Sequence, residues 1–171
     1  TPYDNFGYSV SISNGVTIVG APKDTPHGNL SGSAYVFRYN SASQQWAQEA
    51  KLHDPIGSVA DKFGSVVAVS GNKAVVTAPF WENRTIEFPN QDQGAALLFS
   101  YDPATLQWRP DTRMLAQDGY FFDNMGVALA ISNGVILIGA AKNDANLKMD
   151  SGSAYVFNVS SPLTIAQSSP P

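Results

Sequence analysis

The sequence predicts an all-β protein made of three four-stranded antiparallel units. Three observations predict this fold: a repeat that occurs three times, bulky residues that alternate with small ones, and two-residue turns that follow the alternating segments. Alternation at a spacing of two is the period of a β-strand, and no stretch of this sequence keeps the 3.6-residue period of a helix. The units are therefore built of short strands.

Each copy of the repeat carries two signatures. The first is led by a glycine in every copy, at Gly7, Gly64 and Gly126, with spacings of 57 and 62 residues. The second is the segment Ser31–Phe37, which is identical over seven residues to Ser151–Phe157 and has its counterpart in Gly94–Phe99. Two signatures in the same register exclude chance similarity, so the chain repeats one structural unit of about 60 residues.

The first strand of each unit has one bulky and one small face. In the first copy the bulky side chains are Phe6, Tyr8, Val10 and Ile12, and the small ones are Gly7, Ser9, Ser11 and Ser13. In the third copy they are Met125, Val127, Leu129 and Ile131 against Gly126, Ala128, Ala130 and Ser132. This asymmetry suits sheets stacked face on face, where the bulky side of one sheet fills the space left by its neighbour.

The turns after the first strands are readable from their residues. Asn14-Gly15 and Asn133-Gly134 predict type I′ hairpins, because that turn needs a positive φ at both positions. In the middle copy Gly71-Asn72 places glycine first, which predicts a type II′ turn.

The remaining strands of each unit follow in order. Second strands are expected at 16–21, 74–78 and 135–140, where the residues are apolar without alternation, as in strands covered on both faces. Third strands are expected at 34–37 and its counterparts. Fourth strands are expected at 45–52 and 107–115, each anchored by a tryptophan, Trp46 and Trp108.

Composition excludes several classes of protein. The net charge of −4 provides no basic footprint for nucleic acid. The absence of cysteine excludes disulfide scaffolds, thiol catalysis and cysteine-ligated metals. The sequence contains no run of 18 apolar residues, so no membrane span is predicted. The 43% of hydrophobic residues, with only 14% charged, is enough to bury a core.

The repeat resembles a known family. Phe6-Gly7 leading into Gly20-Ala21-Pro22, and Phe63-Gly64 leading into Ala78-Pro79, are similar to FG-GAP repeats, the β-propeller blades of the integrin α-subunit head. The Gly-Ser-Ala-Tyr-Val-Phe third strand and the Trp-bearing fourth strand resemble the version found in secreted microbial and algal proteins. The resemblance covers residues 3–158 and implies β-propeller blades in an extracellular or cell-surface protein.

One departure from the integrin pattern concerns metal. In integrin-type repeats the loop between the first and second strands is long and holds calcium. Here that loop is only Ser13-Asn14-Gly15 or its counterparts, and a two-residue hairpin cannot supply six to eight oxygen ligands. We therefore expect no calcium in these loops, and no other metal or cofactor is predicted.

The domain prediction is three FG-GAP-like blades over residues 1–159, at about 3–57, 58–118 and 119–159. The third blade lacks a Trp-bearing fourth strand, and residues 160–171 are expected to form a Ser/Pro-rich linker or tail. Because propellers close with about four to eight blades, the predicted propeller is incomplete within this chain.

An open set of blades leaves two end faces. Four strands at ~4.8 Å spacing and six residues at ~3.3 Å give about 380 Å² for each face. If both faces were wholly apolar, leaving them exposed to water would lose roughly 19 kcal/mol of hydrophobic stabilisation. This exceeds the free energy of unfolding of a typical domain, about 5–15 kcal/mol. We therefore expect further copies of this chain, or further blades of a longer one, to cover them.

Aromatic loops are the candidate contact residues for a ligand or partner: Phe80, Trp81, Phe88, Tyr120 and Phe121. The loop around Trp81 has no aromatic counterpart in the other copies, and insertions on a repeat scaffold often carry binding. Trp81 could stack on a sugar ring or anchor a partner. The alternative for both segments is packing against the blades themselves.

Three glycosylation sequons occur, at Asn29, Asn83 and Asn158. About two are expected by chance in this composition, so they are candidates only. Asn29 and Asn83 fall in equivalent loops between the second and third strands.

No catalytic motif is present. The two histidines, His27 and His53, lie near prolines in loop-like sequence and are expected at the surface. The leading hypothesis is a non-catalytic extracellular structural or adhesion module whose blades assemble with further copies or blades, as a fibre or a surface-layer subunit. The alternative is a lectin-like carbohydrate-binding module that uses the aromatic loops.

Overall fold

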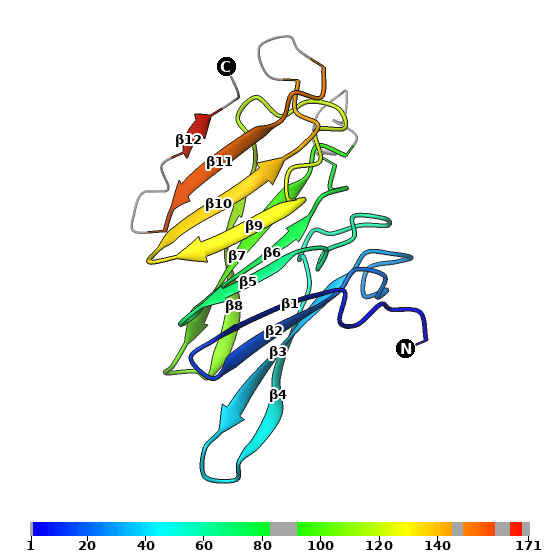
Figure 1. Ribbon diagram of the computed structural model, residues 1–171. Helices are drawn as coiled ribbons and strands as arrows, with labels where there is room; N and C mark the ends of the chain where they lie inside the picture. Colours follow the sequence, from blue (N-terminus) through cyan, green and yellow to red (C-terminus); the bar gives the residue numbers. More distant parts are fainter. Residues whose placement is uncertain (1, 83–91, 145–148, 160–164, 169–171) are drawn as a thin grey trace.

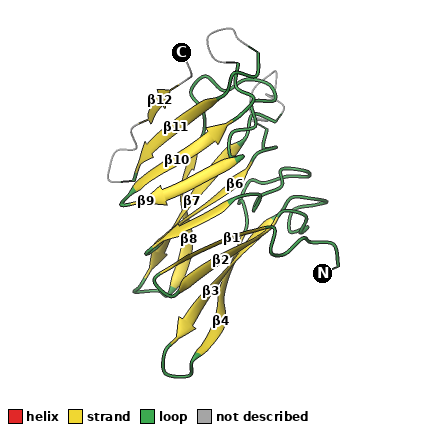
Figure 2. Cartoon of the chain, in the orientation of Figure 1, coloured by secondary structure: helices red, strands yellow, loops and turns green. Residues whose placement is uncertain are grey.

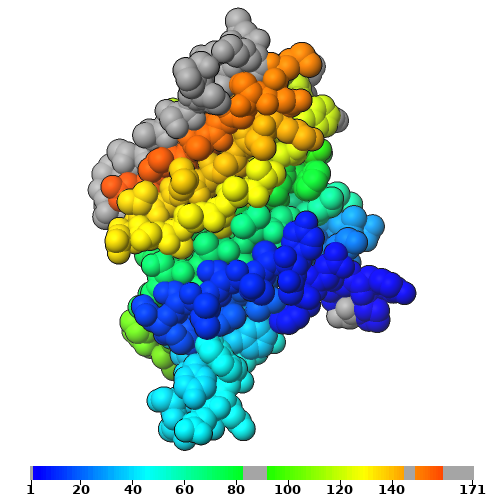
Figure 3. Space-filling model, viewed as in Figure 1, coloured from blue at the N-terminus to red at the C-terminus, as the bar shows by residue number. Residues whose placement is uncertain are grey.

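The computed structural model describes residues 2–82, 92–144, 149–159 and 165–168, the last segment as backbone only. The described residues form three four-stranded antiparallel sheets, each built from consecutive strands of the chain (Figures 1 and 2). We call these sheets blade 1, blade 2 and blade 3. They are stacked in chain order and appear as successive colour bands in the space-filling view (Figure 3).

Blade 1 consists of β1 (Ser9–Ser13), β2 (Val16–Ala21), β3 (Ser33–Asn40) and β4 (Gln45–Leu52). Blade 2 consists of β5 (Val67–Ser70), β6 (Lys73–Ala78), β7 (Ala95–Asp102) and β8 (Gln107–Met114). Blade 3 consists of β9 (Ala128–Ser132), β10 (Val135–Ala140), β11 (Ser153–Asn158) and β12 (Ile165–Ser168). Apart from β12, these are the predicted strands, with differences at their ends.

The predicted turns are confirmed by the backbone. Asn14 and Gly15 both have positive φ, at 47° and 75°, and Asn133 and Gly134 repeat this at 49° and 77°. Both values are what a type I′ turn requires, and its twist matches that of the strands it joins. In the middle turn Gly71 has a φ of 56°, in line with the predicted type II′ turn.

The first hydrophobic core lies between blades 1 and 2. Blade 1 contributes Val16 and Ile18 from β2 and Val36 from β3. Blade 2 contributes the opposing side chains, among them Phe63, Val67, Val69, Leu97, Phe99 and Trp108. The bulky face of β5 thus packs toward blade 1, as the alternation in the sequence predicts.

The second core lies between blades 2 and 3. It uses the opposite face of blade 2, including Val75 and Leu98, against Ile136, Ile138 and Phe157 of blade 3. Blade 2 is covered on both sides, so both faces of its strand β6 are buried. In blade 3 the corresponding strand β10 alternates between exposed and buried positions, because only one of its faces has a neighbour.

The chain end differs from the predicted linker. Residues 165–168, which fall within the expected tail 160–171, form β12 and pair antiparallel with β11, with Phe157 opposite Ile165. The prediction of a tail was wrong at these four residues because backbone pairing with the open edge of β11 does not depend on a tryptophan or a long apolar run. The other residues of the predicted tail, 160–164 and 169–171, lie outside the described part.

Candidate interaction surface

The outer face of blade 1 exposes several large apolar side chains. We define this face by Phe6, Tyr8, Val10, Ile12, Thr17, Phe37 and Trp46. It is the side of blade 1 that points away from blade 2, and blade 1 forms the lower end of the stack in Figure 1. Phe6 packs edge-on against Phe37, with ring centroids 6.1 Å apart, so this aromatic cluster is already organised.

The internal repeat shows what this face looks like when a neighbour covers it. Val10 is 66% exposed, whereas its counterpart in blade 2, Val67, is 5% exposed. Trp46 is 47% exposed, whereas its counterpart Trp108 is 9% exposed. The same holds for Ile12 and Phe6, which are 67% and 56% exposed, against 5% for Val69 and 0% for Phe63. The outer face of blade 1 therefore has the residues of an inter-blade interface without the partner blade.

A shallow hollow lies on this face. It has a volume of about 380 Å³ and is lined by Ile12, Thr17, Phe37 and Trp46. The first three are cross-strand neighbours in one row over β1, β2 and β3. The equivalent row of blade 2 belongs to the core shared with blade 1, so a side chain from a partner blade would be accommodated here.

The Trp108 contact shows how such an interface is locked. The indole Nε1 of Trp108 in blade 2 donates a hydrogen bond of 2.8 Å to Oε2 of Glu49 in blade 1. Arg38 donates to both carboxylate oxygens of Glu49, from Nε at 2.6 Å and from Nη2 at 3.0 Å. The guanidinium of Arg38 also lies 4.5 Å from the ring centre of Tyr101 in blade 2. One carboxylate thus joins two blades.

The protonation of Glu49 fits this role. Burial alone would raise the pKa of its carboxyl, but the hydrogen bonds from Arg38 and Trp108 outweigh it and lower the pKa below its ordinary value. The group is therefore ionised at neutral pH and holds a charge-assisted bond across the interface.

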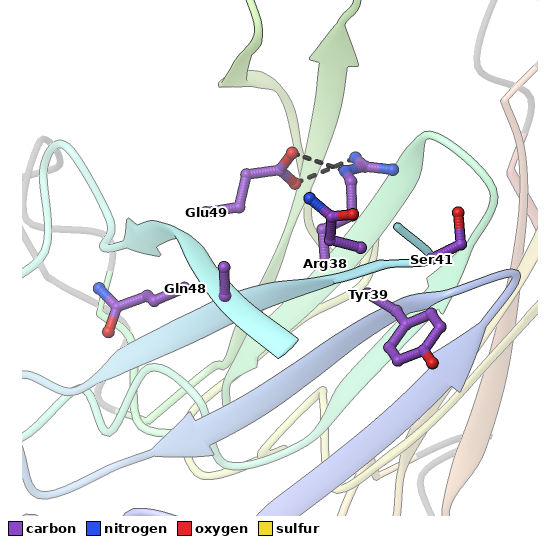
Figure 4. Close-up of a pocket in the computed structure, with 7 residues that line it drawn as sticks. Arg38, Tyr39, Ser41, Gln48 and Glu49 are labelled. Carbon is purple, nitrogen blue, oxygen red and sulfur yellow. Dashed lines mark hydrogen bonds and ion pairs between the residues drawn. The ribbon is translucent and has the colours of Figure 1, made fainter. Parts of the chain in front are cut away.

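Next to this ion pair is a larger open hollow of about 490 Å³ on the β3–β4 hairpin (Figure 4). It is lined by residues of both strands and of their turn, among them Arg38, Tyr39, Gln48 and Glu49. Figure 4 shows Arg38 and Glu49 turned toward each other rather than into open space. Because their charges satisfy one another, the hollow offers a ligand few unpaired polar groups, and its shape follows from the projecting hairpin.

The outer face of blade 3 is the second uncovered sheet surface. Val135 and Leu137 of β10 are 41% and 45% exposed. Their counterparts in blade 1, Val16 and Ile18, are 2% and 0% exposed because blade 2 covers them. The two ends of the stack thus present the two opposite halves of one kind of interface.

The repeat matches a known protein family. The sequence pattern of the FG-GAP repeat matches residues 1–37, 46–99 and 108–157. Each match covers the first three strands of one blade, and the second and third matches begin in the fourth strand of the preceding blade. The chain belongs to the FG-GAP repeat family. FG-GAP repeats form β-propeller-type modules and are typical of extracellular proteins, which agrees with the resemblance drawn from the motifs. No curated protein sequence matches the chain.

A solved structure confirms the fold of this FG-GAP chain. Sqt1 of Saccharomyces cerevisiae aligns over 99% of the chain with a TM-score of 0.58 and 12% sequence identity. The chain spans 36% of the length of Sqt1. At this identity the likeness concerns the fold alone. The described residues contain no helix that is long and apolar enough to cross a membrane.

The predicted aromatic contact residues divide into buried and exposed ones. Trp81 is only 6% exposed and belongs to the core between blades 1 and 2. The guanidinium of Arg113 lies over its ring at 4.7 Å from the centre. Trp81 is therefore a packing residue, and the expectation that it stacks on a sugar was wrong, because its ring is covered by its own FG-GAP blade and by Arg113.

The other predicted contact residues are less deeply placed. Phe80 is half-buried, and the Lys62 ammonium lies 3.9 Å from its ring centre. Tyr120 is 59% exposed and packs edge-on against Phe121 at 4.6 Å between ring centroids. Phe88 lies outside the described residues. Among the described members of the predicted set, Tyr120 is thus the most exposed.

Two of the three sequons can be placed. Asn29 is exposed in the loop between β2 and β3, and Asn158 is exposed at the end of β11. Asn83 lies outside the described residues. Exposure at Asn29 and Asn158 is compatible with an attached glycan.

The structure pairs the two histidines, which the sequence did not predict. His27 and His53 are both exposed, and their ring centroids are 4.9 Å apart. Partial desolvation lowers the pKa of His53, and the neighbouring His27 and Lys51 lower it further. No group of three or more metal-binding side chains occurs within the described residues, so the pair has no third protein ligand there.

Proposed function

We propose that this chain is a non-catalytic extracellular module, a structural or adhesive building block that assembles with further blades or copies through its end faces. The observation that carries this proposal is the outer face of blade 1. At that face Phe6, Val10, Ile12 and Trp46 are about half to two-thirds exposed, while the same positions in blade 2 are covered. A large exposed apolar patch marks an interaction site, and this one has the same residue types as the covered interface between blades 1 and 2.

The energetics favour association. Full burial of a large apolar side chain contributes about 1.5–3 kcal/mol. Covering four such side chains that are half to two-thirds exposed would therefore contribute roughly 3.5–7 kcal/mol before the costs of association are subtracted. Micromolar affinity corresponds to a net free energy of about −8 kcal/mol, so contacts at the second end face must contribute as well.

The charged groups support a structural role. Three buried or partly buried carboxylates are engaged in ion pairs: Glu49 with Arg38, Asp24 with Lys51 and Asp54 with Arg113. Two others, Asp61 and Asp123, accept hydrogen bonds from the backbone amides of Ser58 and Tyr120. Each pair ties strands or connectors together. Such groups hold a fold rather than poise a proton for transfer.

The test is the molar mass in solution. Light scattering between 1 and 100 μM, at 0.15 M and 1 M salt, should show species larger than one chain at both salt concentrations, because apolar contacts are not screened by ions. A discrete monomer over the whole range would contradict the proposed assembly.

The lectin-like alternative has weaker support because Trp81 is buried. Among the described residues of the predicted aromatic set, it would use Tyr120, which is 59% exposed. A glycan array with and without calcium tests it, with Tyr120→Ala as the matched variant. Binding that disappears in this variant would favour the alternative.

A further inference from the structure

We infer that two copies of this chain associate head to tail and close a ring of six blades. This inference rests on the proposed function, since it specifies the partner and the number of copies. In such a ring the outer face of blade 1 in each copy packs against the outer face of blade 3 in the other.

The two faces are complementary because each repeats one side of the interface between blades 1 and 2. In that interface Val16 and Ile18 of β2 pack toward blade 2. The same positions on the outer face of blade 3 are Val135 and Leu137, both exposed. On the opposite side, Val67 and Val69 of blade 2 are matched by Val10 and Ile12 on blade 1. The chain therefore presents both halves of an interface that it already forms internally.

The first strands of the blades, β1, β5 and β9, are complementary in the size of their side chains. β9 exposes its small face, Ala128, Ala130 and Ser132, whereas β1 exposes its bulky face, Val10 and Ile12. Between blades 1 and 2 the bulky face of β5 meets the small face of β1, and Ser11 Oγ there accepts a 3.1 Å hydrogen bond from the Val69 amide. Alanine replaces this serine in β9, so the contact between copies would rely on shape and apolar burial.

The number of blades decides the number of copies. Both ends of a stack differ, so contacts between copies are heterologous and generate either a closed ring or an open filament. Propellers close with about four to eight blades. The three described blades of one copy are too few, two copies supply six, and three copies would supply nine. Two copies are the only whole number within that range.

Sedimentation equilibrium or size-exclusion chromatography with light scattering tests the stoichiometry. The expected mass is about 36 kDa, twice the 18.2 kDa of one chain, and it should not increase further with concentration. Ile12→Glu on blade 1 and Leu137→Glu on blade 3 should each shift the protein to the monomer at micromolar concentration. Both residues are partly exposed in the single chain, so the charge should leave each chain folded, which circular dichroism checks.

Leu106→Glu is the matched control. Leu106 lies in the β7–β8 turn of the covered blade and is 68% exposed, close to the 67% of Ile12, but it belongs to neither end face. This variant should remain a dimer. An equimolar mixture of the Ile12→Glu and Leu137→Glu chains keeps one interface free of substitutions, so it should recover part of the dimer that neither variant forms alone.

The outcomes separate this inference from the proposed function. A series of species that grows with concentration, or a closed species of three or more copies, would overturn the six-bladed ring but keep the assembly module. A dimer that neither end-face variant dissociates would also overturn it. A monomer at all concentrations would overturn both.

Discussion

At the scale of single residues, buried ion pairs fix the connectors to the blades. Asp54 lies in the connector between blades 1 and 2 and its side chain is only 2% exposed. Its carboxylate accepts hydrogen bonds from both terminal nitrogens of Arg113 in β8, with Nη1 to Oδ2 at 2.8 Å. Arg113 in turn covers Trp81. Removal of the carboxylate would leave a guanidinium without its partner and loosen the cover of that ring.

We predict that Asp54→Ala lowers the free energy of unfolding by about 3 kcal/mol, because breaking one partner of a buried pair leaves an uncompensated charge. The matched control is Asp111→Ala, which removes the exposed pair with Lys73, whose side chain is 38% exposed. That change should cost about 1 kcal/mol or less. Urea unfolding measures both, and equal losses would contradict the structural importance of the Asp54 pair.

Asp24 gives a prediction on pH. Burial alone would raise the pKa of its carboxyl, but Lys51 and the Tyr35 hydroxyl, at 2.7 Å and 2.8 Å from Oδ2, together with the Thr25 amide, lower it from 3.8 to about 2. A carboxyl whose pKa is lowered by folding stabilises the fold at pH values above its pKa in the unfolded chain. That contribution is lost as the pH falls through its pKa in the folded protein.

The expected result is that the wild type is more stable than Asp24→Asn at pH 5, by the order of 1 kcal/mol because Lys51 is partly exposed to solvent. This advantage should shrink between pH 4 and pH 2. Other groups, such as Asp123, whose pKa is raised by burial, also make stability depend on pH. They are present in both proteins, so the difference in stability between the two reports on Asp24. Thermal unfolding over this pH range measures the difference, and a constant advantage would contradict the assignment.

At the scale of elements, close backbone crossings join one blade to the next. Gly32 bridges Phe63, and Gly94 makes the equivalent bridge to Met125. Gly94 has a φ of 83°, and a Cβ on it would meet the backbone of Met125. These glycines belong to the Ser-Gly-Ser signature and its counterpart in the middle unit, so the crossing explains why that signature needs a glycine.

We predict that Gly94→Ala destabilises the fold far more than Gly71→Ala does. Gly71 also has positive φ, at 56°, but nothing lies within 4 Å of a Cβ there. The control should therefore cost only the left-handed conformation, about 1–2 kcal/mol, whereas Gly94→Ala should cost at least about 2 kcal/mol more because two blades must separate. Denaturant unfolding compares the two, and similar losses would show that the crossing relaxes easily.

Local elements were predictable because their signals are local. Asn14-Gly15 determines its own turn, and the alternation from Val10 to Ile12 determines a strand and its two faces. β12 was missed because its pairing depends on the free edge of β11, and the short segment Ile165–Ser168 has no alternation of its own that predicts a strand. The burial of Trp81 was also beyond the sequence, since Arg113, which covers it, is 32 residues away in the chain.

At the scale of the whole molecule, the two ends of the stack differ from its middle. Blade 2 is covered on both faces, and its Trp108 is bound by Glu49 of blade 1. Trp46 occupies the same position in blade 1 and is 47% exposed. The three tryptophans therefore report on different surfaces: Trp81 and Trp108 on the core, and Trp46 on the end face.

This difference predicts how tryptophan fluorescence responds to iodide. At high dilution iodide should quench one component, that of Trp46, and leave Trp81 and Trp108 largely protected. At concentrations where the chain associates, the quenchable component should diminish as the end face is covered. Trp46→Phe is the control and should lack that component at every concentration. Quenching that does not change with concentration would mean that this face stays open.

The sequence by itself determined the three units, their strands and hairpin turns, and the bulky and small faces of the first strands, because each depends on neighbours close in the chain. The tertiary structure decided which faces are covered, that Trp81 is buried, that His27 meets His53, and that Glu49 links two blades. These depend on contacts between residues tens of positions apart, whose packing no short pattern encodes. Equivalent residues such as Trp46 and Trp108 have the same local sequence signal and differ only in whether a neighbouring blade lies against them.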